Sequence, residues 1–304
     1  MRLLQIKLRG LGDLPVTNWV TLSRTLTLLR FTDTQVGRQV LEAVQALNPP
    51  YDCLSERPFD NLPMEEAVAG GYRRAIIPEK RTIVIGIFDT PSALVKELGA
   101  LTPPLYETDR VEVGRRLDYS RWTNFVEISS SSRWSEVSED IRKLLHDYPE
   151  GSEAGAVRRL LNEAVPSDRV KGAMAEELAG WLATLEDRRS EIDHYPDILE
   201  KVHRARKFKE ARELLSGRLP QFLAVNGDAV PEVSELRAIS NDAGITPVLL
   251  IDCFEAAPQE RRMAAVPEKI GTLAEHCQCL CFVDNLHAGW GVSDAQVVDF
   301  AGLN

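Results

Sequence analysis

Three consecutive residues near the N-terminus could contact a phosphate group. Gly37, Arg38 and Gln39 lie in a polar stretch between an apolar run at 26–29 and a helical pattern that reaches residue 47. Glycine lets backbone N–H groups approach a phosphate closely, and a neighbouring cation neutralises its charge. The stretch therefore has the strand–loop–helix layout of a phosphate-binding loop.

The loop sequence lacks most of the residues that such a site uses. A working loop follows the pattern G-x-x-x-x-G-K-[ST]. In one register Phe31 and Val36 stand at the two glycine positions. A shift by one residue places Gly37 and Arg38 on the Gly-Lys pair, but Gln39 then stands where a hydroxyl should bind magnesium. Neither register predicts a working site, and an ordinary strand–loop–helix without nucleotide ancestry is the alternative interpretation.

A carboxylate at the end of a second apolar run could bind magnesium. Residues 247–251 read Pro-Val-Leu-Leu-Ile and are followed by Asp252. A buried parallel strand has a continuous apolar run, and its carboxyl end lies at the edge where α/β sheets bind ligands. The next residue, where a water-activating glutamate is expected, is Cys253, and a thiol cannot polarise water as a carboxylate does. Glu255 follows two residues later and could replace that glutamate.

The order of these patterns resembles the ATPase heads of the SMC, Rad50 and RecF type. Within about the first 50 residues, the matching positions are Leu4, Ile6, Leu8, Arg9, Gly10, Leu11, 26–29 and 41–44. A helical pattern at 232–240 precedes the apolar run at 247–253 by the spacing that the family has between its signature helix and its magnesium-binding strand. The Leu-Ser-Gly-Gly-Glu signature itself is reduced to Val233-Ser234-Glu235. The resemblance implies an α/β fold of the ABC-ATPase head kind.

The chain changes character at a tract of four serines, residues 129–132. Strands are predicted before it, at 81–88, 110–115 and 124–129. Four segments with apolar spacings of three and four follow it, at 135–148, 154–165, 168–192 and 197–215. They lack sustained heptads, so we expect a compact helical bundle in place of the family's coiled coil. We predict an N-terminal half of the head (1–130), a helical insertion (131–216) and a C-terminal half (217–304), with the strands at 26–29 and 248–252 as neighbours in one sheet.

Alternating cysteines near the C-terminus could bind a soft metal or sense redox state. His276 is followed by Cys277, Cys279 and Cys281, and alternate side chains of a strand point to one face. Cysteine is also among the most buried residue types, and structural zinc sites use paired clusters with wider spacing. We therefore predict a core strand without a metal, with the metal or redox sensor as an alternative. The total of five cysteines fits reduced thiols better than a disulfide framework.

Length and charge limit the remaining functions. The 304 residues can bury a full core, and no apolar run approaches the roughly 18 residues of a membrane span. Without a signal-peptide pattern, we expect a cytoplasmic protein with no membrane contact. The formal net charge of −10 argues against a protein that coats nucleic acid. The basic segment 201–213 contains interleaved glutamates and is expected to be a solvated helix face, so any contact with nucleic acid should be indirect.

The departures from the phosphate-loop pattern and the missing glutamate after Asp252 together predict a non-catalytic pseudo-ATPase that uses no cofactor. Gly37, Arg38, Gln39 and Asp252 would then be the remnant of a nucleotide site. In the resembled family two heads sandwich ATP, so a head without nucleotide must be held by protein partners, either in a larger complex or in a homodimer. One candidate is a complex that acts on nucleic acid in DNA repair or defence. The alternative enzyme is an active ATPase whose site is rebuilt from Arg38, Asp252 and Glu255.

Overall fold

The chain forms two compact units in the computed structural model. The structure describes residues 1–11, 14–60, 78–101, 109–149, 153–254, 260–284 and 295–300. The sheet unit consists of residues 1–91, 109–123 and 218–304, and the helical unit of residues 92–108 and 124–217. The helical unit thus contains the segment 131–216 together with residues on its N-terminal side. No helix in the described part of the chain is long and apolar enough to cross a membrane.

A parallel sheet forms the centre of the sheet unit, with the strand order β11-β4-β10-β9-β8. Its strands are β4 (Leu26–Phe31), β8 (Phe222–Asn226), β9 (Val248–Asp252), β10 (Gln278–Asp284) and β11 (Gln296–Asp299). The α/β fold class is as predicted. Direct pairing of the strands at 26–29 and 248–252 was wrong, because β10 lies between them and Cys281 is in register with both Leu28 and Ile251. All but the last residue of β10 is buried, which favours a central position over an edge.

A second, antiparallel sheet has the order β2-β1-β5-β6-β7, and β3 also pairs with β1. Its strands are β1 (Leu3–Leu11), β2 (Leu14–Val16), β3 (Val20–Thr21), β5 (Thr82–Asp89), β6 (Arg110–Arg116) and β7 (Arg121–Phe125). The strand predicted at 124–129 therefore begins and ends earlier. A tight turn after β6 explains the shift: Ser120 N–H donates to the Asp118 carboxylate at 3.0 Å, and Tyr119 has a positive φ of 63°.

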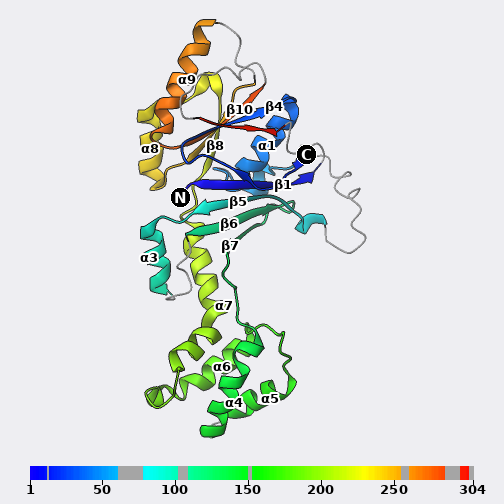
Figure 1. The fold of residues 1–304 in the computed structure, drawn as a ribbon, viewed down its shortest axis with the longest axis vertical. Coiled ribbons are helices and arrows are strands. Elements are labelled where there is room, and N and C mark those ends of the chain that lie inside the picture. Colours follow the sequence, from blue (N-terminus) through cyan, green and yellow to red (C-terminus); the bar gives the residue numbers. More distant parts are fainter. Residues whose placement is uncertain are drawn as a thin grey trace. The chain divides into compact units, whose positions relative to one another are not determined.

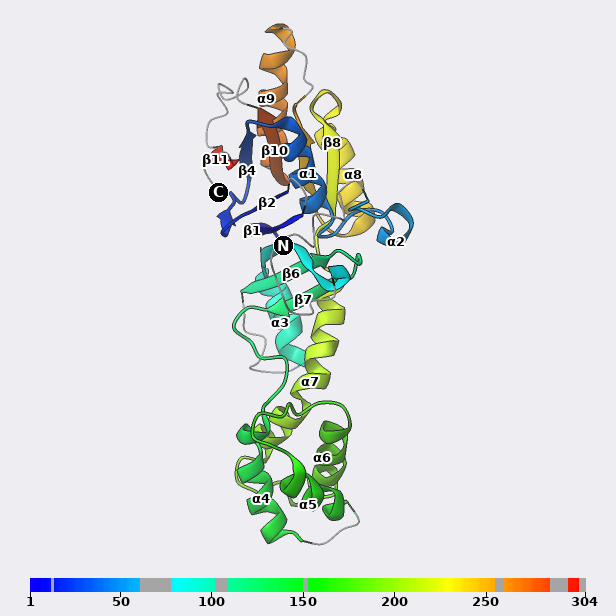
Figure 2. The same ribbon diagram turned by 90° about the vertical axis from the view of Figure 1, so that its right-hand side faces the viewer.

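Helix α1 (Thr34–Gln45) lies between the two sheets, as Figure 2 shows for β10 on one side and β1 on the other. Its Val40 and Val44 side chains are fully buried. The Asp33 carboxylate caps its N-terminus, and the Arg115 guanidinium donates to the Ala46 carbonyl at its C-terminus over 2.6 Å. Both ends of the helix are therefore fixed by side chains of the sheet unit.

Helices α8 (Val233–Ala243) and α9 (Glu260–Ala274) cover the opposite face of the parallel sheet (Figure 1). Leu236 of α8 and Ile270 and Leu273 of α9 pack there against alternate residues of the strands, including the cysteines. The sheet unit also contains the short helix α2 (Cys53–Glu56) and 3-10 helices at Pro78–Lys80 and Gly227–Ala229.

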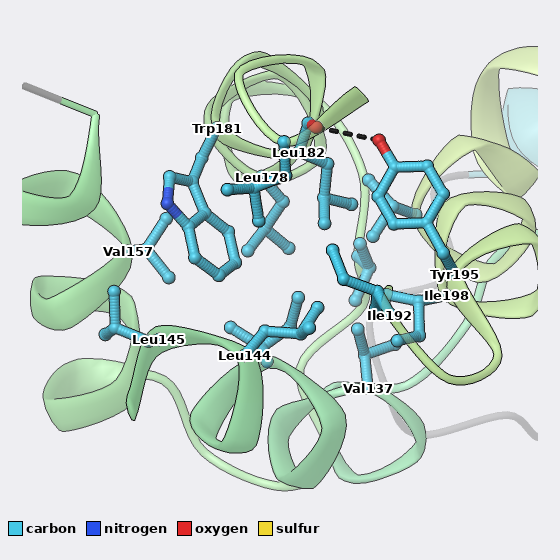
Figure 3. Close-up of a cluster of buried hydrophobic side chains, with 14 of the residues drawn as sticks. Val137, Leu144, Leu145, Val157, Leu178, Trp181, Leu182, Ile192, Tyr195 and Ile198 are labelled. Carbon is cyan, nitrogen blue, oxygen red and sulfur yellow. Dashed lines mark hydrogen bonds between the residues drawn. The ribbon is translucent and has the colours of Figure 1, made fainter. Parts of the chain in front are cut away.

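The helical unit packs around a core of its own, drawn in Figure 3. Its elements are α3 (Ser92–Leu101), α4 (Ser138–Asp147), α5 (Ala154–Glu163), α6 (Ala173–Ala183), α7 (Tyr195–Ser216) and 3-10 helices at Trp134–Glu136 and Glu186–Arg188. Trp181 is fully buried beside Leu178 and Val157. The Tyr195 hydroxyl donates to the Leu182 carbonyl at 2.7 Å, which joins α7 to α6. The helical periodicity after the serine tract is confirmed for α4 to α7.

Candidate nucleotide site

The carboxyl edge of the parallel sheet is where a nucleotide would bind. From β4 the chain passes to β8, at the far edge of the sheet. It then returns one strand at a time, through β9 to β10, which lies beside β4. From β10 it crosses over β4 to form β11 at the other edge. The strand order therefore reverses between β4 and β10, and open α/β sheets bind ligands outside the strand ends at such a point. Helix α1 follows β4 at this same edge, so its N-terminus lies where a phosphate would be held.

The connection between β4 and α1 is too short to wrap a phosphate. Strand β4 ends at Phe31 and α1 begins at Thr34, so Thr32 and Asp33 alone join them. A phosphate-binding loop has four residues between its two glycines and presents several N–H groups inward. Neither residue of this connection is a glycine, so the backbone has no such cradle.

The N-terminus of α1 already holds an anion from the chain itself. The Asp33 carboxylate accepts hydrogen bonds from the N–H groups of Gln35 at 2.8 Å and Val36 at 3.4 Å. These are the kind of free helix donors that bind phosphate in a nucleotide site. A second anion about 4 Å away would be repelled by about 1 kcal/mol in water and about 4 kcal/mol at the effective dielectric of a protein surface. Asp33 thus takes the place of the ligand.

Phenylalanine side chains fill the space beside this helix end. The aromatic rings of Phe254, Phe282 and Phe300 surround Phe31, with centroid distances of 6.1, 6.0 and 4.6 Å. Gly37 is buried under this phenylalanine cluster, since a Cβ atom added there would lie 2.2 Å from Cζ of Phe254 and 3.1 Å from Cγ of Phe31. The glycine is therefore explained by close packing of an aromatic ring.

Two of the predicted site residues do meet. The Arg38 Nε atom lies 3.4 Å from Oδ2 of Asp252, across the gap between α1 and β9. Their side chains are 43% and 26% exposed, so solvent screens the pair and its contribution to stability is small. The other oxygen of Asp252 accepts the Phe254 N–H at 3.0 Å, a bond that fixes the turn leading to the phenylalanine cluster.

The remaining predicted residues are not arranged around a ligand. Gln39 is buried, with 8% of its surface exposed, and its Oε1 atom has no hydrogen-bond partner in the described part of the chain. It therefore does not offer a magnesium ligand at the sheet edge. Glu255, the carboxylate of the alternative enzyme site, lies outside the described residues.

The segment that resembles the family signature forms the first turn of α8. Its N-terminus also carries carboxylates of the chain: Glu235 accepts the Glu232 N–H at 2.7 Å, and Glu232 pairs with Lys269 at 2.6 Å. In the resembled family this segment faces the nucleotide of the other head. Here the negative charge of Glu232 and Glu235 disfavours a phosphate at this helix end.

The cysteines of β10 belong to the core between the sheet and helices α8 and α9. The thiols of Cys277 and Cys279 are 3.7 Å apart; Cys277, which precedes β10, and Cys279 and Cys281 within it are all buried. The hydrogen bond with Cys277, together with burial, raises the pKa of Cys279, and a hydrogen bond with Cys253 and burial likewise raise the pKa of Cys281. His276 is exposed, and the described residues contain no group of three or more potential metal ligands. Protonated buried thiols are poor nucleophiles and poor ligands.

Comparisons with known proteins give only matches of low similarity. No protein-family description and no curated protein matches the sequence. Among solved structures, the Pyrococcus furiosus Smc head bound to the C-terminal domain of ScpA has 12% identity and a TM-score of 0.38, covering 94% of this chain and 90% of that chain. The Thermotoga maritima SMC head has 10% identity and a TM-score of 0.37, covering 98% and 95%. The recombination mediator RecF with ATP has 11% identity and a TM-score of 0.35, covering 94% of each chain. At these values the proposals below rest on the residues of this chain.

Proposed function

We propose that this protein is a pseudo-ATPase: a head of the ABC-ATPase kind that neither binds nor hydrolyses nucleotide and acts as an assembly or regulatory subunit. One observation carries the proposal. The helix end that would hold the phosphates is capped by Asp33 and is covered by Phe254. The remnant residues Gly37, Arg38, Gln39 and Asp252 then serve packing and local ion pairing.

The cost of binding ATP at this site supports the proposal. A phosphate would have to displace the Asp33 cap, which is worth about 1 kcal/mol, and move the Phe254 ring out of its contact with Phe31, worth about 0.5–1.5 kcal/mol. The displaced carboxylate would remain nearby and repel the ligand. No lysine stands at the first turn of α1 to offset these terms, and Arg38 is already close to Asp252.

Isothermal titration calorimetry with ATP and magnesium tests the proposal directly. We expect no heat of binding at micromolar nucleotide and no phosphate release above the buffer blank. The variant Asp33→Asn with Phe254→Ala removes the charge and the ring together, and it measures how much of the block these two residues supply. Micromolar, magnesium-dependent affinity of the unmodified protein would refute the pseudo-ATPase.

The alternative enzyme has one observation in its favour, the 3.4 Å approach of Arg38 to Asp252. A rebuilt site would use the guanidinium to neutralise phosphate and the carboxylate to hold magnesium. If the protein does hydrolyse ATP, Arg38→Ala should abolish turnover while leaving the fold unchanged. Loss of activity in that variant would favour the enzyme, whereas equal background rates in both proteins favour the pseudo-ATPase.

Protein partners follow from the same proposal. A head whose phosphate position is occupied by its own Asp33 and Phe254 cannot be joined to a second head through ATP, so we propose that this chain is held by a protein partner independently of nucleotide. A stable interface would bury at least about 1,000 Å². Affinity purification from the native host under gentle conditions, followed by mass spectrometry, should recover stoichiometric partners or a homodimer. Recovery of a monodisperse monomer alone would contradict this part of the proposal.

A further inference from the structure

The helical unit contains a groove of about 650 Å³ with a strongly basic lining. Helices α6 and α7 form its walls, and the segments around residues 130–131 and 169–172 close one side. The charged groups among its lining residues are Arg169, Lys171, Arg206, Lys209, Arg212 and one carboxylate, Glu176. This concentration of positive charge contrasts with the formal net charge of −10 for the whole chain. A local concentration of positive charge of this kind is typical of a surface that binds an anionic ligand.

Most of this charge remains available to a ligand. Among the described residues, no carboxylate pairs with Arg169, Lys171 or Arg212. Arg206 and Lys209 lie 3.7 and 3.9 Å from glutamates one turn later on α7, and all four of these side chains are well exposed. Exposed pairs of this type contribute only tenths of a kcal/mol and exchange readily with another anion.

One guanidinium is held in place. Arg169 donates to the Ser129 hydroxyl at 3.2 Å and to the Ser131 carbonyl at 3.1 Å. These bonds use the serine tract to fix the position of Arg169 without neutralising its charge. The tract therefore has a structural explanation at the edge of the groove.

The N-terminus of α6 adds to the positive field of the groove. Gly172, with a φ of +55°, is the N-cap residue of α6 and lines the groove, and no side chain caps this helix end. Its first N–H groups and the helix dipole favour a negative charge. Along the same wall, Ala175 and Ala179 are small, so a ligand can approach the helix surface closely.

We propose that this groove binds the sugar–phosphate backbone of a single-stranded nucleic acid, independently of its base sequence. Guanidinium groups recognise phosphate oxygens in a bidentate manner, and a basic channel that follows one backbone is typical of single-strand binding. Phe208, the aromatic ring in the lining, is only 4% exposed, so the groove offers no stacking platform for bases. This contact would be direct, unlike the indirect one expected from the overall charge. It lies in the helical unit, so it can succeed or fail independently of the pseudo-ATPase proposal.

A histidine in the groove supplies a second signature. His203 lines the groove, and burial, followed by Arg206 and Lys207, lowers its pKa, while Glu210 opposes this. A bound phosphate would stabilise the imidazolium and so raise this pKa on binding. The charged groups that line the groove opposite α7 are Glu176, Lys171 and Arg169.

Fluorescence anisotropy of the full chain with a labelled oligothymidylate of about 20 nucleotides tests the groove. The groove variant is Lys171→Gln with Arg206→Gln and Arg212→Gln. The control variant, Arg142→Gln with Lys143→Gln and Arg158→Gln, removes the same charge from helices α4 and α5 of the same unit. Circular dichroism checks that both remain folded. The unmodified protein should show a slope of log K against log salt of about −3.5 if all five cations contact phosphates, at about 0.7 for each contact.

We expect the groove variant to bind at least tenfold more weakly and its salt slope to be shallower by about 2, with the control variant within twofold of the unmodified protein. Equal weakening in both variants, or no salt-dependent binding by the unmodified protein, would overturn the proposal. So would displacement by polyglutamate of the same charge at equal concentration, because the groove would then be a site for acidic peptides. Tighter binding of a duplex of the same length would contradict a single-stranded ligand.

Discussion

Replacing Gly37 with alanine should reveal whether the phenylalanine cluster fills the nucleotide position. Alanine is preferred over glycine inside a helix by about 0.5–1 kcal/mol, so an unobstructed site would gain stability. The new Cβ would instead lie 2.2 Å from the Phe254 ring. Real contacts of this kind are longer than 3 Å, so the ring must move, and overpacking of this sort costs about 1–3 kcal/mol. We expect Gly37→Ala to destabilise the sheet unit by about 1–2 kcal/mol.

The sign of the effect should reverse when the ring is absent. In a Phe254→Ala background the 2.2 Å contact is lost, and the nearest atom is Cγ of Phe31 at 3.1 Å from the added Cβ. With a shift of Phe31 by a few tenths of an ångström, Gly37→Ala should stabilise by up to about 0.5–1 kcal/mol. The two substitutions would then have a coupling energy of about 1–3 kcal/mol in a double-mutant cycle. Gly271→Ala in α9 is the matched control, because it lies in the same unit and nothing approaches its added Cβ within 4 Å. It should stabilise the protein equally in both backgrounds.

Urea denaturation followed by circular dichroism and tryptophan fluorescence measures these differences. Two compact units can unfold separately, so the data should be fitted with one transition for each unit, and the substitutions should move only that of the sheet unit. A stabilising effect of Gly37→Ala that is the same with and without Phe254 would show that the ring does not cover the helix. The argument for a filled phosphate position would then fail.

Three further outcomes follow from other contacts. Asp33→Ala should lower stability by about 1 kcal/mol through loss of the cap on α1, while Asp33→Asn should retain most of it, as measured by the same denaturation. Oligonucleotide affinity should rise as pH falls below the ordinary histidine pKa of about 6.5, because phosphate binding raises the lowered pKa of His203 and takes up a proton; His203→Gln should flatten this profile. A thiol reagent should modify Cys53 in the native protein and the four buried cysteines only after unfolding; rapid native modification of more than one thiol would contradict their core position.

The parallel strands were predictable because buried strands have continuous apolar runs. The predicted strands at 26–29 and 248–252 are such patterns; β9 has the predicted bounds, and β4 extends two residues further, to Phe31. The order of strands across the sheet was not predictable from these runs. It depends on which faces are covered by α1, α8 and α9, and that coverage places the cysteine strand between β4 and β9. Local pattern identifies a strand, but its neighbours are chosen by tertiary packing.

The candidate site divides in the same way. The capping role of Asp33 has a local signal, an aspartate directly before a helical pattern, and could have been read from the sequence. The sequence has no local signal that Phe254 covers Gly37, because the two residues are 217 positions apart. The direction of the Phe254 ring also depends on the hydrogen bond from the Phe254 N–H to the Asp252 carboxylate. The approach of Arg38 to Asp252 followed from the expected sheet edge, since parallel strands end on the same side.

A free helix N-terminus favours an anion, and the anion can come from a ligand or from the chain. At α1 it comes from the chain, through Asp33, and carboxylates also lie at the start of α8, in Glu232 and Glu235. At α6 in the helical unit, the corresponding helix end has no side-chain cap and lies in a groove whose Arg169, Lys171 and Arg212 pair with no carboxylate of the described residues. A tethered carboxylate competes at high effective concentration, so in the proposed function nucleotide does not switch the capped sites at ordinary levels. In the proposed function, the anion-binding capacity of this chain therefore resides in the helical unit, and association of its head must be constitutive.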